Sequence, residues 1–244
     1  MSSTLAVMKR ELKGYFLTPV AYVFIVIFLI ASNWLAFGVG ALFERGQADL
    51  APFFTFHPWL FLFLVPALSM RLWAEERKSG SIELLLTLPL QPWHAVAGKF
   101  FAAWLFTALA IILTFPIWIT INVLGSPDNG AILAAYVGSI LMAGGFLAVG
   151  SCLSALTKNQ VIAFILSVIV CFILLAAGYP FVLNVFSAWL PPTIVDGIAS
   201  LGFLAHFEDI SRGVIDLRDI VYFGLLIGTC LYANTLVLGI KQAD

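Results

Sequence analysis

The residues of this chain that could take part in chemistry gather in one charged stretch. Residues 71–89 open with a cluster of both charge signs, continue through a Ser-Gly-Ser break and end in a leucine-rich run. Ser81 can cap a helix there, and Glu83 would lie in its first turn, where the helix dipole favours an acid. Pro89 ends that helix. The pattern predicts a short surface helix whose charges are left for water or for a partner.

The sequence lacks the residues that nucleotide binding, hydrolysis or metal binding would need. No Gly-x-x-x-x-Gly-Lys-Ser/Thr motif occurs, so the chain has no phosphate-binding loop of its own, and in Gly98-Lys99-Phe100 a phenylalanine replaces the required hydroxyl. A hydrolytic site would need a nucleophile with a base beside it. The serines in apolar runs have no such base, and the histidines have no partner at ligand spacing: Ser151, Ser154, Ser167, His57, His94 and His206. We therefore predict neither a catalytic residue nor a metal site.

Composition indicates a membrane protein. Of 244 residues, 62% are hydrophobic and 10% are charged. An average soluble domain is about half apolar and about a quarter charged. The chain therefore has too little polar surface to face water, and its apolar excess must face lipid.

Six stretches without Asp, Glu, Lys or Arg are each long enough, at about 20 residues, to cross a bilayer as a helix. The predicted fold is an all-α polytopic membrane protein, with one transmembrane domain over residues 1–244. No Asp, Glu, Lys or Arg lies deep in a predicted span, which counts against an ion-driven carrier. The predicted spans are 19–41, 54–72, 100–122, 132–156, 160–182 and 220–240.

The basic residues predict the orientation. With six spans both termini lie on one side, and nine of the twelve Lys and Arg residues fall on that side. Cytoplasmic loops carry the excess of Lys and Arg, so both termini are expected in the cytoplasm. The stretch 71–99 then connects spans two and three on the cytoplasmic side. Its spacing leaves two interpretations open: an interfacial helix with solvated charges, or a docking element for a cytoplasmic motor.

Residues 75–89, which read Glu-Glu-Arg-Lys-Ser-Gly-Ser-Ile-Glu-Leu-Leu-Leu-Thr-Leu-Pro, with Gly98-Lys99-Phe100 after them, resemble the signature of ABC-2 type permeases. In that family this stretch forms the coupling helix that rests on the ATPase subunit. The stretch 206–219 narrows the resemblance to GldF-like permeases, which are associated with gliding motility. The resemblance places these residues at or near the ATPase contact: Glu75, Glu76, Arg77, Ser79, Gly80 and Glu83.

The resemblance also implies partners. These are a pair of cytoplasmic ATPase subunits that hold ATP and magnesium, a second permease subunit, and a GldG-like protein with an extracytoplasmic domain. The surroundings would be membrane lipid of the bacterial inner membrane, and no nucleic acid is expected. The chain would couple ATP hydrolysis to export or to mechanical work on an outside partner. The alternative is a membrane scaffold that anchors a cytoplasmic protein and transports nothing.

The outer segment 183–219 precedes the last span. Apolar residues between Ile194 and Phe207 recur every three to four positions, which predicts a helix lying in the outer interface. Such a helix either only seals the bundle or serves as an outer gate or docking face. In the second case the candidate contacts are Glu208, Asp209, Arg212, Asp216 and Arg218.

Overall fold

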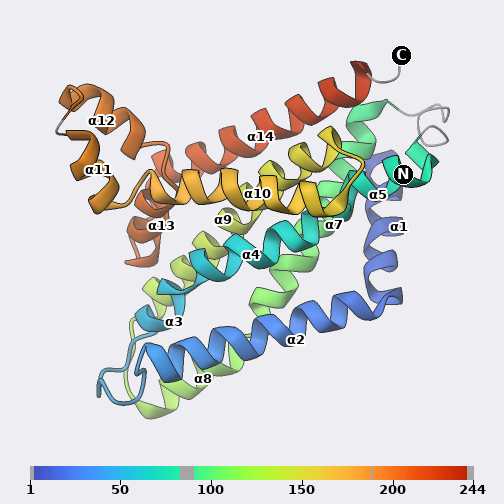
Figure 1. The fold of residues 1–244 in the computed structure, drawn as a ribbon. Helices are drawn as coiled ribbons and strands as arrows, with labels where there is room; N and C mark the ends of the chain where they lie inside the picture. The colour runs from blue at the N-terminus through green and yellow to red at the C-terminus, as the bar shows by residue number, and fades with distance from the viewer. Residues whose placement is uncertain (1–2, 83–90, 188, 241–244) are drawn as a thin grey trace.

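The chain is all-helical in this computed structural model, which describes residues 3–82, 91–187 and 189–240 (Figure 1). Within those ranges it has no strand. Four helices are long and apolar enough to cross a membrane: Pro19–Val39, Pro92–Leu124, Asn129–Leu156 and Leu217–Gly239. A further apolar helix, Gln160–Ala176, is shorter.

The described helices follow one another from the N-terminal end of the chain. In order they are α1 (Ser3–Leu17), α2 (Pro19–Trp34), the π-helix η1 (Leu35–Val39), α3 (Ala51–Thr55), α4 (His57–Ser69), α5 (Arg71–Ser79), α7 (Pro92–Ile112), α8 (Phe115–Leu124), α9 (Asn129–Leu156), α10 (Gln160–Ala176), α11 (Pro180–Ser187), α12 (Pro192–Ala199), α13 (Phe203–Ser211) and α14 (Leu217–Ile240).

The bundle has two distinct ends (Figure 1). At one end lie α1, α5, the start of α7 and the end of α14. At the other end lie α3, α8 and the small helices α11 to α13. Helix α1 runs across the first end of the bundle, whereas α2 runs along it. The change of direction falls at Thr18-Pro19, where proline begins α2 and the residue before it is extended.

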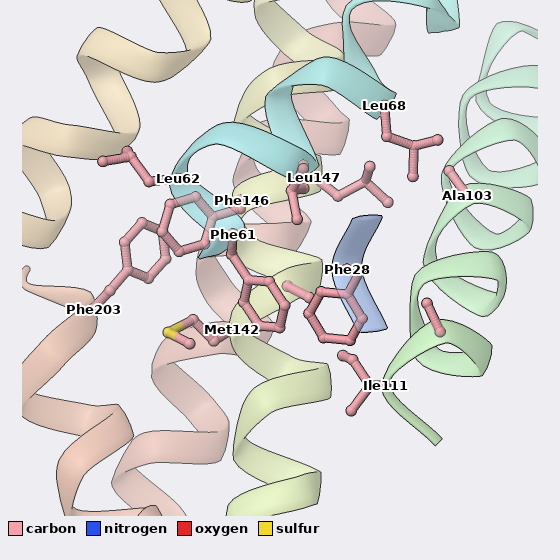
Figure 2. Close-up of a cluster of buried hydrophobic side chains, with 14 of the residues drawn as sticks. Phe28, Phe61, Leu62, Leu68, Ala103, Ile111, Met142, Phe146, Leu147 and Phe203 are labelled. Atoms are coloured by element: carbon pink, nitrogen blue, oxygen red, sulfur yellow. The ribbon is translucent and has the colours of Figure 1, made fainter. Parts of the chain in front are cut away.

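Helix α9 forms the centre. It packs against α4, α5, α7, α10, α13 and α14, and small residues along it allow this close approach. A Cβ on Gly145 would lie 2.8 Å from the Phe203 ring, and one on Gly150 would overlap the Ser69 hydroxyl. Figure 2 shows the core around this helix, where Met142, Phe146 and Leu147 of α9 meet side chains from the surrounding helices.

The second predicted span, 54–72, is divided in the structure. Helix α3 ends at Thr55, α4 covers His57–Ser69, and α5 begins at Arg71 after a break at Met70. Pro58 lies in the first turn of α4, where its missing N–H leaves no hydrogen bond unmade. The α10 helix likewise ends at Ala176, short of the predicted 182, and a new helix begins at Pro180.

Two further features differ from the expectations. The outer apolar stripe lies on two helices rather than one, because the chain turns at residues 200–202 between α12 and α13. Helix α1 was not predicted at all. Its residues are mixed in polarity and give no uncharged window, so a search for spans passes over it.

Candidate functional site

The break between α4 and α5 is closed by a serine of the central helix. The Oγ of Ser154 donates to the carbonyl of Met70 (2.9 Å) and accepts from the backbone N–H groups of Trp73 (3.2 Å) and Ala74 (3.1 Å). The Trp73 indole N–H also donates to Ser151 (3.2 Å). These bonds satisfy backbone groups that the break leaves open, which holds the start of α5 against α9.

Lys99 lies at the centre of a second junction, which joins α1, α5 and α7. Its Nζ is 3.2 Å from Glu11 Oε2 of α1 and 2.8 Å from Glu76 Oε1 of α5. The residue is only 3% exposed, and its ammonium lies 5.3 Å from the centre of the Trp73 ring. We call Glu11, Glu76 and Lys99 the Lys99 triad.

The sequence explains why α1 reaches this position. A Cβ on Gly98 would lie 2.7 Å from Val7 Cβ, so a larger residue there would push α1 away from α7. Val7 is the buried residue of α1, while Lys9, Arg10 and Lys13 face outward. Glycine at position 98 therefore brings the next residue, the buried lysine, within reach of α1.

The triad has two carboxylates and one ammonium group, and Arg10 supplies a second cation beside Glu11. Burial by itself raises the pKa of Glu11, but Lys99 and Arg10 beside it outweigh that effect, and the net shift of the pKa is downward. The Glu76 Oε2 atom is buried and has no hydrogen-bond partner among the described residues. Removing either carboxylate would therefore take an ion-pair partner from a buried ammonium group.

The residues predicted at the ATPase contact fall into two groups. Glu76 and Arg77 turn inward: Glu76 joins the triad, and Arg77 donates to the carbonyl of Ala155 at 2.6 Å. Glu75, Ser79 and Gly80 are exposed. Gly80 ends α5 with a φ of 73°, a left-handed conformation that glycine adopts without strain. Of the predicted coupling stretch 75–89, Glu83 and the residues after it lie outside the described residues.

The outer candidates are all exposed, and two of them share a cavity. Glu208 and Arg212 form an exposed ion pair at 3.5 Å and line a cavity of about 520 Å³ at the α3 and α13 end of the bundle. Trp59 and Tyr179 contribute aromatic walls to the same cavity. The other three candidates, Asp209, Asp216 and Arg218, do not line it.

A buried pair beside these residues was missed from the sequence. His206 Nδ1 lies 2.6 Å from Asp219 Oδ1, and His206 Nε2 lies 3.0 Å from the carbonyl oxygen of Ser200. Since both neighbours of the ring are acceptors, Nε2 carries a proton and a further proton lies between Nδ1 and the carboxyl. The Tyr222 ring stacks on the histidine at 4.0 Å. The pair joins α13 to the first turn of α14.

Taken together, the geometry suits the transmission of movement. Three elements at one end are joined through a buried lysine, and the central helix connects that end to the outer helices. No group of three or more metal-ligating side chains comes together within residues 3–82, 91–187 and 189–240.

Comparison with known families gives one match. The model of the ABC-2 family transporter protein matches residues 55–210, which is more than half of the chain and includes α5, Lys99 and α9. Comparison with curated proteins gives no match. ABC-2 permeases are membrane components without a catalytic site of their own, and they typically pair with an ABC ATPase. The chain belongs to the ABC-2 family and is a multi-pass membrane permease of an ABC transporter.

Proposed function

We propose that the chain carries force from a separate cytoplasmic ATPase to the outer half of its own bundle. The ATPase, which holds ATP and magnesium, would bind at α5 and at the predicted coupling helix after it. The exposed residues Glu75, Lys78, Ser79 and Gly80 would face this partner. In this arrangement the six predicted segments cross the bacterial inner membrane as one domain, and the α1 and α5 end lies in the cytoplasm.

The Lys99 triad is the observation that carries the proposal. Moving α5 alone would pull Glu76 away from Lys99 and leave the largely buried Glu76 carboxylate without its cation, and breaking a buried pair typically costs about 3–5 kcal/mol. Moving α1, α5 and α7 together keeps both ion pairs. A push on the exposed face of α5 should therefore shift the start of α7 rather than bend α5 locally.

We infer further partners from the resemblance to GldF-like permeases. A second permease subunit would complete the membrane unit, and a GldG-like protein would bind at the outer end. Glu208 and Arg212 are exposed and line the cavity of about 520 Å³, which supports that position for an outside partner, as does the exposure of Asp209, Asp216 and Arg218. The work done would be export or mechanical action on that partner.

The test is co-purification from native membranes in mild detergent, with ATPase activity measured on the eluate. We expect a P-loop ATPase to come with the wild-type chain. Lys78→Glu reverses an exposed charge of α5 and should reduce recovery at least about tenfold, since like-charge contacts at an interface cost several kcal/mol. Glu44→Lys is the matched control, because it reverses an exposed charge outside α5.

Two results would contradict the proposal in different ways. A chain that elutes alone, under conditions that preserve other membrane complexes, would remove the ATPase partner. An ATPase that co-purifies but hydrolyses ATP at the same rate with wild-type and Glu76→Gln chains would instead support the non-transporting scaffold, because the triad would then have no part in coupling.

A further inference from the structure

A second cavity lies at the α1 and α5 end of the bundle, next to the Lys99 triad. Its volume is about 430 Å³, within the range of about 300–1,000 Å³ that small-molecule sites occupy. Residues of α1, α2, α4 and α5 line it, together with Lys99 of α7. It therefore lies between α1 and α5, which carry its charged residues, and the apolar helices α2 and α4.

The polarity of the cavity changes from one end to the other. Arg71, Glu75 and the Lys99 triad line one end, and all of them lie on α1, α5 or the start of α7. The rest of the wall is apolar and includes Val20, Val23 and Ile27 of α2, which are each about half exposed. In a membrane protein those α2 residues face lipid, so the apolar end of the cavity opens toward acyl chains.

The charged residues at the polar end determine which ligand groups could bind there. Three carboxylates and two cations line it, which gives a formal sum of −1. Lys99 is already occupied by Glu11 and Glu76, whereas Arg71 and Glu75 are exposed and form no ion pair among the described residues. These two residues lie four positions apart on α5, so they share one face of the helix.

A guanidinium binds phosphate through two parallel hydrogen bonds, and a carboxylate binds an ammonium group. Glu76 favours a ligand that donates hydrogen bonds, because its buried Oε2 has no hydrogen-bond donor among the described residues. A primary ammonium supplies N–H donors, and a quaternary one supplies none. From this geometry we propose that the cavity binds one phospholipid with a primary-amine, zwitterionic head group, its phosphate at Arg71, its ammonium at Glu75 and Glu76, and its acyl chains along α2.

The inference requires only that the chain is a membrane protein, and it does not depend on the ATPase. Native mass spectrometry of the purified chain in detergent tests it, with dioleoyl phosphatidylethanolamine, phosphatidylcholine and phosphatidylglycerol compared at equal concentration. The first lipid should bind at least about tenfold more tightly than the other two, because choline cannot donate the charge-assisted hydrogen bond and the glycerol head group has no ammonium for the carboxylates. Equal binding of all three lipids would overturn the head-group assignment.

Variants locate the site. Gly14 lines the cavity and a Cβ there meets nothing within 4 Å, so Gly14→Leu should fill the space without displacing the backbone and abolish the preference. Gly228→Leu is the matched control, since that glycine of α14 is equally unobstructed and lies outside the cavity. Arg71→Gln removes an exposed cation and should lower phosphatidylethanolamine binding at least about tenfold. A preference that survives both Gly14→Leu and Arg71→Gln would place the lipid elsewhere and refute the proposal.

Discussion

Lys99→Met gives the most direct test of the Lys99 triad. Methionine keeps most of the volume of the side chain but removes the charge that neutralises Glu11 and Glu76. Removing one partner of a buried ion pair typically costs about 3–5 kcal/mol, because the remaining charge stays buried without compensation. For a chain of this size, about 2–4 °C per kcal/mol converts this into a loss of roughly 6–20 °C in the thermal midpoint.

The chain carries its own probe for the measurement. Cys171 is fully buried in α10, so once the partly exposed Cys152 and Cys230 are replaced by alanine, a thiol-reactive fluorophore reports its exposure as the detergent-solubilised protein is heated. Lys158→Met is the matched control, because it makes the same change at an exposed lysine outside the helices. An exposed substitution of this kind is expected to change stability by no more than about 0.5 kcal/mol.

A compensated variant separates charge from packing. If the loss in Lys99→Met comes from the two carboxylates that lose this cation, then adding Glu11→Gln and Glu76→Gln should restore much of the midpoint, since neutral amides carry no charge to bury. A midpoint for Lys99→Met within about 2 °C of wild type would refute the reasoning. A triple variant no more stable than the single one would assign the effect to lost packing instead.

Three further predictions concern single contacts and use the same thermal assay. The pKa of Glu11 is lowered in the folded chain, so the stabilising effect of the carboxylate is complete above the unfolded pKa of 4.5 and is lost as the pH falls through the lowered pKa. The advantage in thermal midpoint of wild type over Glu11→Gln should therefore be constant near neutral pH and shrink below about pH 4.5. Ser154→Ala removes the side chain that closes the α4–α5 break and should cost about 1–3 kcal/mol, whereas the exposed Ser187→Ala should change little. Asp219→Ala leaves a buried nitrogen of His206 without a partner and should cost about 1–3 kcal/mol. Asp219→Asn can still form a hydrogen bond with that nitrogen and should retain most of the stability, so equal losses in the two variants would show that this hydrogen bond does not account for the effect.

The sequence predicted the fold class because that depends on composition. Long apolar windows specify helices in lipid, where every backbone polar group must be satisfied within its own segment. The structure is all-helical in the ranges it describes, and four helices have the length and hydropathy of spans. The windows could not predict where helices break. Met70 and Phe56 are apolar, and the break at Met70 is stabilised by Ser154, which is 84 residues away.

The candidate site was predicted only in part, because its buried charges pair with residues of other helices. Lys99 and Asp219 each lie one position before a predicted span, so they were assigned to connections although both are buried. Their partners come from other helices: Glu11 is 88 positions from Lys99, and His206 is separated from Asp219 by a turn. Charge patterning within a window cannot reveal such pairs. One local signal did exist, namely the isolated Gly98-Lys99 at the edge of an apolar run, where a lysine must either extend to the interface or find a carboxylate.

The central helix provides the physical connection between the two ends. Helix α9 has 28 residues, so at about 1.5 Å per residue it is roughly 40 Å long. Near one end Ser154 holds the start of α5, and nearer the other end Gly138 packs directly against Ile210 of α13. A continuous helix resists bending, so displacement at the α5 end must shift or tilt α9 as a unit. Such a movement of α9 would therefore displace α13, whose residue Glu208 lines the cavity of about 520 Å³.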